Sequence, residues 1–101
     1  MPQFLVLCYD YADAGERRVA TRPTHIEQLK PMIEKGNVLC AGGILDDSGT
    51  KAVGSAFMME MPGRAELDAW VKGEPYSKGR VWERVEIKQL RVVVRDGKLS
   101  P

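Results

Sequence analysis

QFLVLCYD, at residues 3–10, is apolar at almost every position and does not alternate between apolar and polar side chains. Successive side chains of a β-strand point to opposite faces. One face of this strand would carry Phe4, Val6 and Cys8, and the other Leu5, Leu7 and Tyr9. A strand that is apolar on both faces is covered on both faces. One layer of helices covers only one of them, so the stretch predicts a second covering layer, which we expect to be another copy of the chain.

The remaining segments predict the order βαββαβ. The expected elements are strand 3–10, loop 11–21, helix 22–36, strand 37–45, turn 46–50, strand 51–61, helix 64–72 and strand 81–94. The first helix is predicted because its apolar residues fall on one face. Those residues are Ile26, Leu29, Met32 and Ile33, and Pro31 is expected to kink the helix. In the second helix Leu67, Trp70 and Val71 are expected to point inward.

This order, with right-handed crossovers, predicts a ferredoxin-like α+β fold. Its four-stranded antiparallel sheet has the order 4-1-3-2, with both helices on one face. The 101 residues suit a single domain, with a core at about residues 3–94 and a flexible tail at 95–101.

Charge, hydropathy and cysteine content bear on which classes of protein this chain can belong to. A formal net charge of +1 implies no strongly basic face, so we do not expect the protein to bind nucleic acid. No segment approaches the ~20 apolar residues of a membrane span, and the N-terminus lacks the pattern of a signal peptide, so we expect a cytoplasmic protein. Cys8 and Cys40 lie in apolar runs and are expected to be buried hydrophobes, although a disulfide between neighbouring strands stays open.

His25 is the only histidine, and helical spacing places it inside the apolar stripe of the first helix, with Arg22 pointing in a similar direction. A buried polar pair needs partners or a ligand. Imidazole can act as a general acid or base near neutral pH. The alternative is a histidine at the edge of the core that bonds to a backbone carbonyl.

Two further segments offer polar groups. Glu74 and Tyr76 flank Pro75, which would hold them on a rigid turn, and a carboxylate facing His25 would orient the imidazole ring. The alternative is a solvated glutamate and a packed tyrosine. Ser55 follows Gly54 in a central strand and offers a hydroxyl donor, without the surroundings of a nucleophilic serine. No spacing of metal ligands is present, and no cofactor is expected.

Four motifs resemble, in order, those of the YCII-related domain family, and together they cover about residues 3–94. They are RPTHIEQL, VLCAGG, VGSAFMMEM and AWVKGEPYSKGRVWERVEIKQL. The family is similar in fold to the dimeric α+β barrel proteins, which include muconolactone isomerases. The resemblance implies a homodimer, a pocket between helices and sheet, and a His–Asp pair at its centre. By position the pair is His25 and Glu74, so this chain has Glu where the family pattern has Asp. One branch of the family resembles a chloromuconolactone dehalogenase.

We therefore expect an enzyme without a cofactor, in which His25 moves a proton on a small organic substrate, as a lyase, isomerase or dehalogenase does. Glu74 would orient His25, Arg22 would pair with a substrate carboxylate, and Tyr76 or Ser55 would donate a hydrogen bond. Two alternatives stay open. One is a non-catalytic module that binds a small molecule or serves regulation, and the other is an interaction protein with a vestigial pocket.

Overall fold

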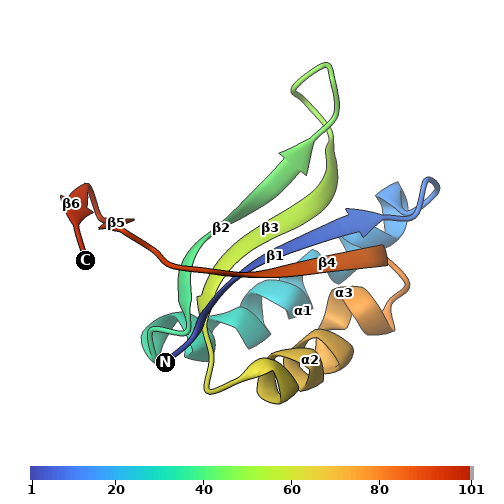
Figure 1. Cartoon of the computed structure of the whole chain (residues 1–101). Helices are drawn as coiled ribbons and strands as arrows, with labels where there is room; N and C mark the ends of the chain where they lie inside the picture. Colours follow the sequence, from blue (N-terminus) through green and yellow to red (C-terminus); the bar gives the residue numbers. More distant parts are fainter. Residues whose placement is uncertain (101) are drawn as a thin grey trace.

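The computed structural model describes residues 1–100 and has two layers, a curved sheet and helices on one of its faces (Figure 1). The elements are β1 (Gln3–Asp10), α1 (Gly15–Glu34), β2 (Val38–Leu45), β3 (Ala52–Glu60), α2 (Arg64–Gly73), α3 (Pro75–Lys78), β4 (Trp82–Leu90), β5 (Val94–Arg95) and β6 (Lys98–Leu99). The main sheet has the order β2-β3-β1-β4, and all its neighbouring strands are antiparallel. The predicted ferredoxin-like topology and strand order are confirmed.

The two faces of β1 meet different surroundings. Phe4, Val6 and Cys8 are buried beneath the helices, whereas Leu5, Leu7 and Tyr9 on the opposite face are only half-buried. The neighbouring strand β3 repeats this pattern, with its buried and exposed faces in register with those of β1. Its helix side carries Ser55, Phe57 and Met59, and its open side carries Ala56 and Met58. An apolar strip therefore runs along the open face of the sheet.

Helix α1 begins seven residues before the expected start. The polar stretch predicted as a loop, residues 11–21, forms the first turns of the helix from Gly15 onward. Arg17 explains part of this difference, because its guanidinium donates to the carbonyl oxygen of Arg80 at 2.9 and 3.0 Å and to Asp13 Oδ1 at 3.1 Å. The contact with Arg80, 63 residues away, thus helps to fix a helical turn that has little apolar character of its own.

The helical layer differs from the prediction at Ile33 and in the segment between α2 and β4. Ile33, expected on the buried face of α1, is 53% exposed and lines a cavity described below. Pro23 and Pro31 both lie within the continuous helix. The segment between α2 and β4, for which no element was expected, contains the short helix α3.

The last strand is shorter than predicted, because β4 ends at Leu90 rather than at residue 94. The expected flexible tail carries a small hairpin formed by β5 and β6, which stands apart from the body of the protein in Figure 1. Arg95 of this hairpin pairs with Glu60 of β3 at 2.8 Å. Pro101 lies outside the described residues.

The two cysteines have different surroundings and are both free, so the strands carry no disulfide. Cys8 is fully buried, and this burial raises the pKa of its thiol to about 12, which keeps it protonated and inert. Cys40 on β2 is exposed, against the expectation of a buried residue. No helix within residues 1–100 has the length and apolar character needed to cross a membrane.

Candidate functional site

His25 and Glu74 meet although 49 residues separate them. His25 lies on the sheet-facing side of α1 and is buried, and Glu74 lies at the junction of α2 and α3 and is 3% exposed. His25 Nδ1 and Glu74 Oε1 form a hydrogen bond. The structure thus brings together the two residues that the sequence proposed as a His–acid pair.

The segment EPYSK fixes the position of Glu74. Glu74 is the N-cap of α3, and its Oε2 accepts a hydrogen bond from the backbone N–H of Tyr76 at 2.6 Å. Pro75 occupies the first turn of α3, where its missing N–H costs nothing. With Oε2 engaged by the backbone, Oε1 is left to face His25.

The His25 ring is also held by aromatic neighbours. The ring of Tyr76 stacks on it with 4.1 Å between centroids and 18° between planes. Phe57 and Trp82 approach it edge-on at 6.3 and 6.5 Å. Packing on several sides therefore leaves the imidazole little freedom to rotate away from Glu74.

The second ring nitrogen of His25 behaves differently from the first. No group within residues 1–100 hydrogen-bonds to Nε2, and Nε2 is not one of the fully buried polar atoms without a partner. His25 lines a large cavity, so Nε2 is open to that space. An Nδ1–H donated to Glu74 would leave the lone pair of Nε2 available there.

This cavity lies between α1 and the hairpin of β2 and β3, has a volume of about 1240 Å³, and is called the α1–β2 cavity below. Its apolar walls come mostly from α1 and β2. Members of these walls include Ile26, Leu29, Ile33, Val38, Leu39 and Ala41. Its polar end carries His25, Ser55 and Tyr76, so one end of the hollow offers hydrogen bonds and the rest offers apolar contact.

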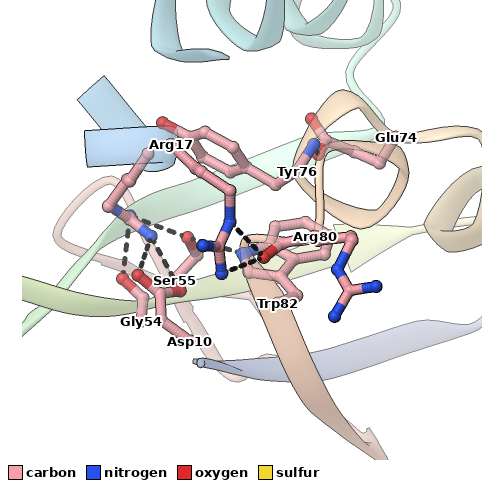
Figure 2. Close-up of polar contacts among 9 residues, drawn as sticks. Asp10, Arg17, Gly54, Ser55, Glu74, Tyr76, Arg80 and Trp82 are labelled. Atoms are coloured by element: carbon pink, nitrogen blue, oxygen red, sulfur yellow. Dashed lines mark hydrogen bonds and ion pairs between the residues drawn. The ribbon is translucent and has the colours of Figure 1, made fainter. Parts of the chain in front are cut away.

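A largely buried ion pair of Arg18 and Asp10 adjoins this polar end, and Arg18 is itself one of the residues that line the cavity. Arg18 Nη1 donates to both carboxylate oxygens of Asp10 at 2.9 and 3.0 Å, and Nη2 donates to the carbonyl oxygen of Gly54 at 2.9 Å and to Ser55 Oγ at 3.0 Å. Trp82 Nε1 also donates to Ser55 Oγ, at 3.2 Å. Figure 2 shows Asp10, Gly54 and Ser55 grouped beside Trp82, with Tyr76 and Glu74 nearby.

Burial raises the pKa of Asp10, which belongs to this ion pair, and that of Tyr76, which lies beside it. Desolvation raises the pKa of the Asp10 carboxyl, although the guanidinium of Arg18 acts in the opposite direction. Desolvation also raises the pKa of the Tyr76 hydroxyl, against the opposing charges of Arg18 and Arg22. Tyr76 is therefore a neutral phenol near neutral pH and can donate a hydrogen bond.

The predicted site residues occupy one region with different exposure. His25, Ser55, Tyr76 and Glu74 are buried, and the first three line the cavity. Arg22 also lines the cavity but is exposed. Within residues 1–100 no group of three or more His, Cys, Asp or Glu residues is placed to hold a metal ion.

Three residues around the site, Arg18, Asp10 and Trp82, are absent from the residues predicted from the sequence. A spacing signal was present, because Arg18, Arg22, His25 and Leu29 follow the i, i+4, i+7, i+11 pattern of one helix face. The predicted loop at residues 11–21 leaves Arg18 outside the helix, whereas α1 begins at Gly15.

Comparison with solved structures supports the fold. The 5-chloro-2-hydroxyhydroquinone dehydrochlorinase TftG from Burkholderia phenoliruptrix AC1100, solved in complex with 2,5-dihydroxybenzoquinone, superposes with a TM-score of 0.78. The match has 18% identity and covers 88% of this chain and 93% of that one. A solved antibiotic biosynthesis monooxygenase gives a TM-score of 0.53 at 15% identity, covering 92% of this chain and 99% of that one. At such identities the likeness concerns the fold alone.

Curated relatives and a family model cover most of the sequence. Protein YciI of Escherichia coli O6:H1 is 28% identical over 95 residues, which cover 89% of this chain and 97% of the relative. The derivative of benzaldehyde biosynthesis cluster protein C of Emericella nidulans is 32% identical over 84 residues, which cover 76% and 86%. The model of the YCII-related domain matches residues 2–91. The resemblance seen in the motifs is thereby confirmed, and the chain belongs to the YCII-related domain family.

Proposed function

We propose that this protein is an enzyme that needs no cofactor and uses His25 to move a proton on a small organic substrate bound in the α1–β2 cavity. The observation that carries the proposal is the buried contact between His25 Nδ1 and Glu74 Oε1, with His25 Nε2 left open to the cavity.

The proposed proton transfer depends on the different partners of the two ring nitrogens of His25. Glu74 accepts the hydrogen bond of Nδ1–H, which fixes the tautomer in which Nε2 has a free lone pair. A substrate C–H or O–H placed within hydrogen-bond reach of Nε2 would lose its proton to this nitrogen. The resulting imidazolium would be stabilised by the carboxylate of Glu74, and its proton could return to the substrate or pass to a leaving group.

The lining of the cavity favours an organic molecule with oxygen substituents. Arg18, Arg22 and Lys51 place positive charge at the wall. Glu16 is the acidic residue that lines it. Ser55 and Tyr76 supply hydroxyl groups to the cavity that His25 lines, and Arg22 could pair with a carboxylate through its planar guanidinium. The names of two similar proteins, a dehydrochlorinase and a benzaldehyde-derivative biosynthesis protein, suggest a hydroxylated aromatic ring or quinone as the first class to test.

The test uses two probes. Chloride release from 5-chloro-2-hydroxyhydroquinone measures turnover, and quenching of tryptophan fluorescence by 2,5-dihydroxybenzoquinone measures binding. We expect His25→Gln to lower turnover about 10²- to 10⁴-fold, the range for loss of a general acid–base group, while binding changes little. Glu27→Gln, an exposed change on the same helix, is the matched control and should leave both unchanged.

Full turnover by His25→Gln would refute the role of this residue. Binding without turnover of this or related hydroxylated aromatics would instead favour the non-catalytic binding module. The structure also supports this alternative, because the apolar walls and the polar end of the cavity suit a bound ligand with or without catalysis.

We also propose that the protein is a homodimer, associated through the open face of the sheet. This face carries Leu5, Leu7, Tyr9, Ala56 and Met58, and no helix covers it in Figure 1. Isologous stacking of two such faces would remove the strip from water. Both cysteines are free, which suits the reducing cytosol where we expect the dimer to act.

Sedimentation equilibrium tests the dimer. We expect twice the chain mass for the wild-type protein and a shift towards the single-chain mass for Met58→Lys, which places a charge on the strip. Glu83→Lys, an exposed change on β4, serves as the control and should leave the mass unchanged. A wild-type monomer would contradict the proposal.

A further inference from the structure

The Ser55 hydroxyl lines the cavity and is held by two donors of the protein. A serine hydroxyl has two acceptor lone pairs and one O–H donor. Arg18 Nη2 and Trp82 Nε1 both reach Ser55 Oγ, at 3.0 and 3.2 Å. Guanidinium and indole N–H groups only donate, so these two contacts use both acceptor positions of the oxygen.

The remaining hydrogen of Ser55 has no partner in the protein. Among residues 1–100 no acceptor receives a hydrogen bond from Ser55 Oγ, since both of its side-chain contacts are with donors. Ser55 is only 3% exposed, and the space it touches is the α1–β2 cavity. Its O–H is therefore available to whatever occupies the polar end of the cavity.

We propose that Arg18 and Trp82 commit the Ser55 hydroxyl to donate into the cavity, where it binds an anionic oxygen of the substrate, of the phenolate or enolate kind. This inference rests on the proposed function and specifies the substrate class of the same site. Removal of a proton by His25 leaves negative charge on the substrate, and a donor held in advance at that charge lowers the barrier.

Arg18 is a positioning residue in this arrangement. Both N–H groups of its Nη2 are used by Gly54 and Ser55, and Nη1 is used by Asp10. Its side chain is 12% exposed, and its guanidinium lies 4.8 Å from the centre of the Tyr76 ring. Its positive charge thus polarises Ser55 and lies near Tyr76.

The test compares two ligands that differ in one group. 4-Nitrophenol at alkaline pH presents a phenolate oxygen, whereas 4-nitroanisole carries a methyl ether at the same position. We expect the wild-type protein to bind the phenolate more tightly than the ether, and Ser55→Ala to reduce this preference about tenfold to a hundredfold, the range for a hydrogen bond to a charged group. Dissociation constants are measured by fluorescence quenching, and the absorption band of bound nitrophenolate reports its hydrogen bonding.

Two further variants separate a binding role from a structural one. Ser55→Thr keeps a hydroxyl and should restore most of the preference. Trp82→Phe keeps an aromatic ring but frees one lone pair of Ser55, and should lower the preference and shift the nitrophenolate band. A preference that survives unchanged in both Ser55→Ala and Trp82→Phe overturns the inference.

Failure here is distinct from failure of the proposed function. Unchanged anion preference in Ser55→Ala, together with lost turnover in His25→Gln, would reject the role of Ser55 and keep that of His25. Lost preference in Ser55→Ala, together with full turnover in His25→Gln, would support Ser55 and reject His25 as the base.

Discussion

Replacement of Gly54 by alanine is expected to destabilise the protein by about 3 kcal/mol, at the upper end for an over-packed site. A Cβ at this position would lie 2.5 Å from the backbone carbonyl oxygen of Cys8 and 3.1 Å from Ile44 Cδ1. The carbonyl belongs to β1, the central strand that pairs with β3 here, so relief of the contact requires the two strands to separate. Urea unfolding followed by circular dichroism measures the loss.

We expect Gly54→Ala to disturb the arrangement of Arg18 and Ser55 as well as the stability of the protein. Gly54 supplies the carbonyl oxygen that accepts from Arg18, and Ser55 is its neighbour in β3. A shift of this strand moves both partners of the guanidinium. We therefore expect Gly54→Ala to lose the anion preference assigned to Ser55 even under conditions where the variant is still folded.

Gly42→Ala is the matched control for this prediction. Gly42 lies on the neighbouring strand β2, and a Cβ there would meet nothing within 4 Å. Alanine in an unobstructed strand stabilises a protein slightly, by about 0.5 kcal/mol, because the unfolded chain loses freedom. Equal unfolding free energies for the two variants would contradict the account of a close approach at Gly54.

The apolar pattern of the strands was sufficient to predict the sheet. The two-sided pattern of residues 3–10 indicated a central strand, and the charged alternation of residues 81–94 indicated an edge strand, and β1 and β4 occupy those places. The apolar pattern of a strand reflects which of its faces are buried, so it predicts the position of the strand well where burial determines the residue types.

The start of α1 could not be predicted in the same way. Residues 11–21 carry no apolar stripe, and Ala14 at the N-cap provides no side-chain bond to the helix. This turn is held by Arg17 at the Arg80 carbonyl and by Arg18 at Asp10. Tertiary hydrogen bonds of this kind leave no local pattern in the sequence. The only local signal is the helical spacing of Arg18 with Arg22 and His25, and the prediction of a loop at residues 11–21 does not use it.

The site was predicted in part. Helical spacing alone placed His25 inside the buried face, and the structure confirms its burial. The Pro75 turn made Glu74 a candidate partner, with a solvated glutamate as the alternative, and the family resemblance gave the same position. A separation of 49 residues carries no spacing rule of its own. The capping contact of Glu74 with Tyr76, which aims the other carboxylate oxygen at His25, was visible only in the structure.

That cap makes the outcome of Glu74→Gln specific. The glutamine oxygen must accept from the Tyr76 N–H, because its NH₂ group would face another donor there. The NH₂ group is then turned to His25 Nδ1 and donates to it. His25 is forced into the tautomer with its proton on Nε2, and the cavity loses its base.

We expect Glu74→Gln to lower turnover about 10³- to 10⁴-fold, the range seen when a histidine base is held in the wrong tautomer. Because His25 is the only histidine, ¹⁵N labelling of histidine gives the signals of this ring alone. At alkaline pH, where imidazole is neutral, the wild-type protein should show Nδ1–H and Glu74→Gln should show Nε2–H. This readout needs no substrate.

Glu74→Asp separates the effect of charge from that of reach. Aspartate caps a helix well and keeps the carboxylate, but it is one methylene shorter than the glutamate that now bridges Tyr76 and His25. We expect it to keep the Nδ1–H tautomer and a turnover between those of the wild type and Glu74→Gln. An Nδ1–H tautomer in Glu74→Gln would mean that the carboxylate does not set the proton on His25, and the proposed base would lose its physical support.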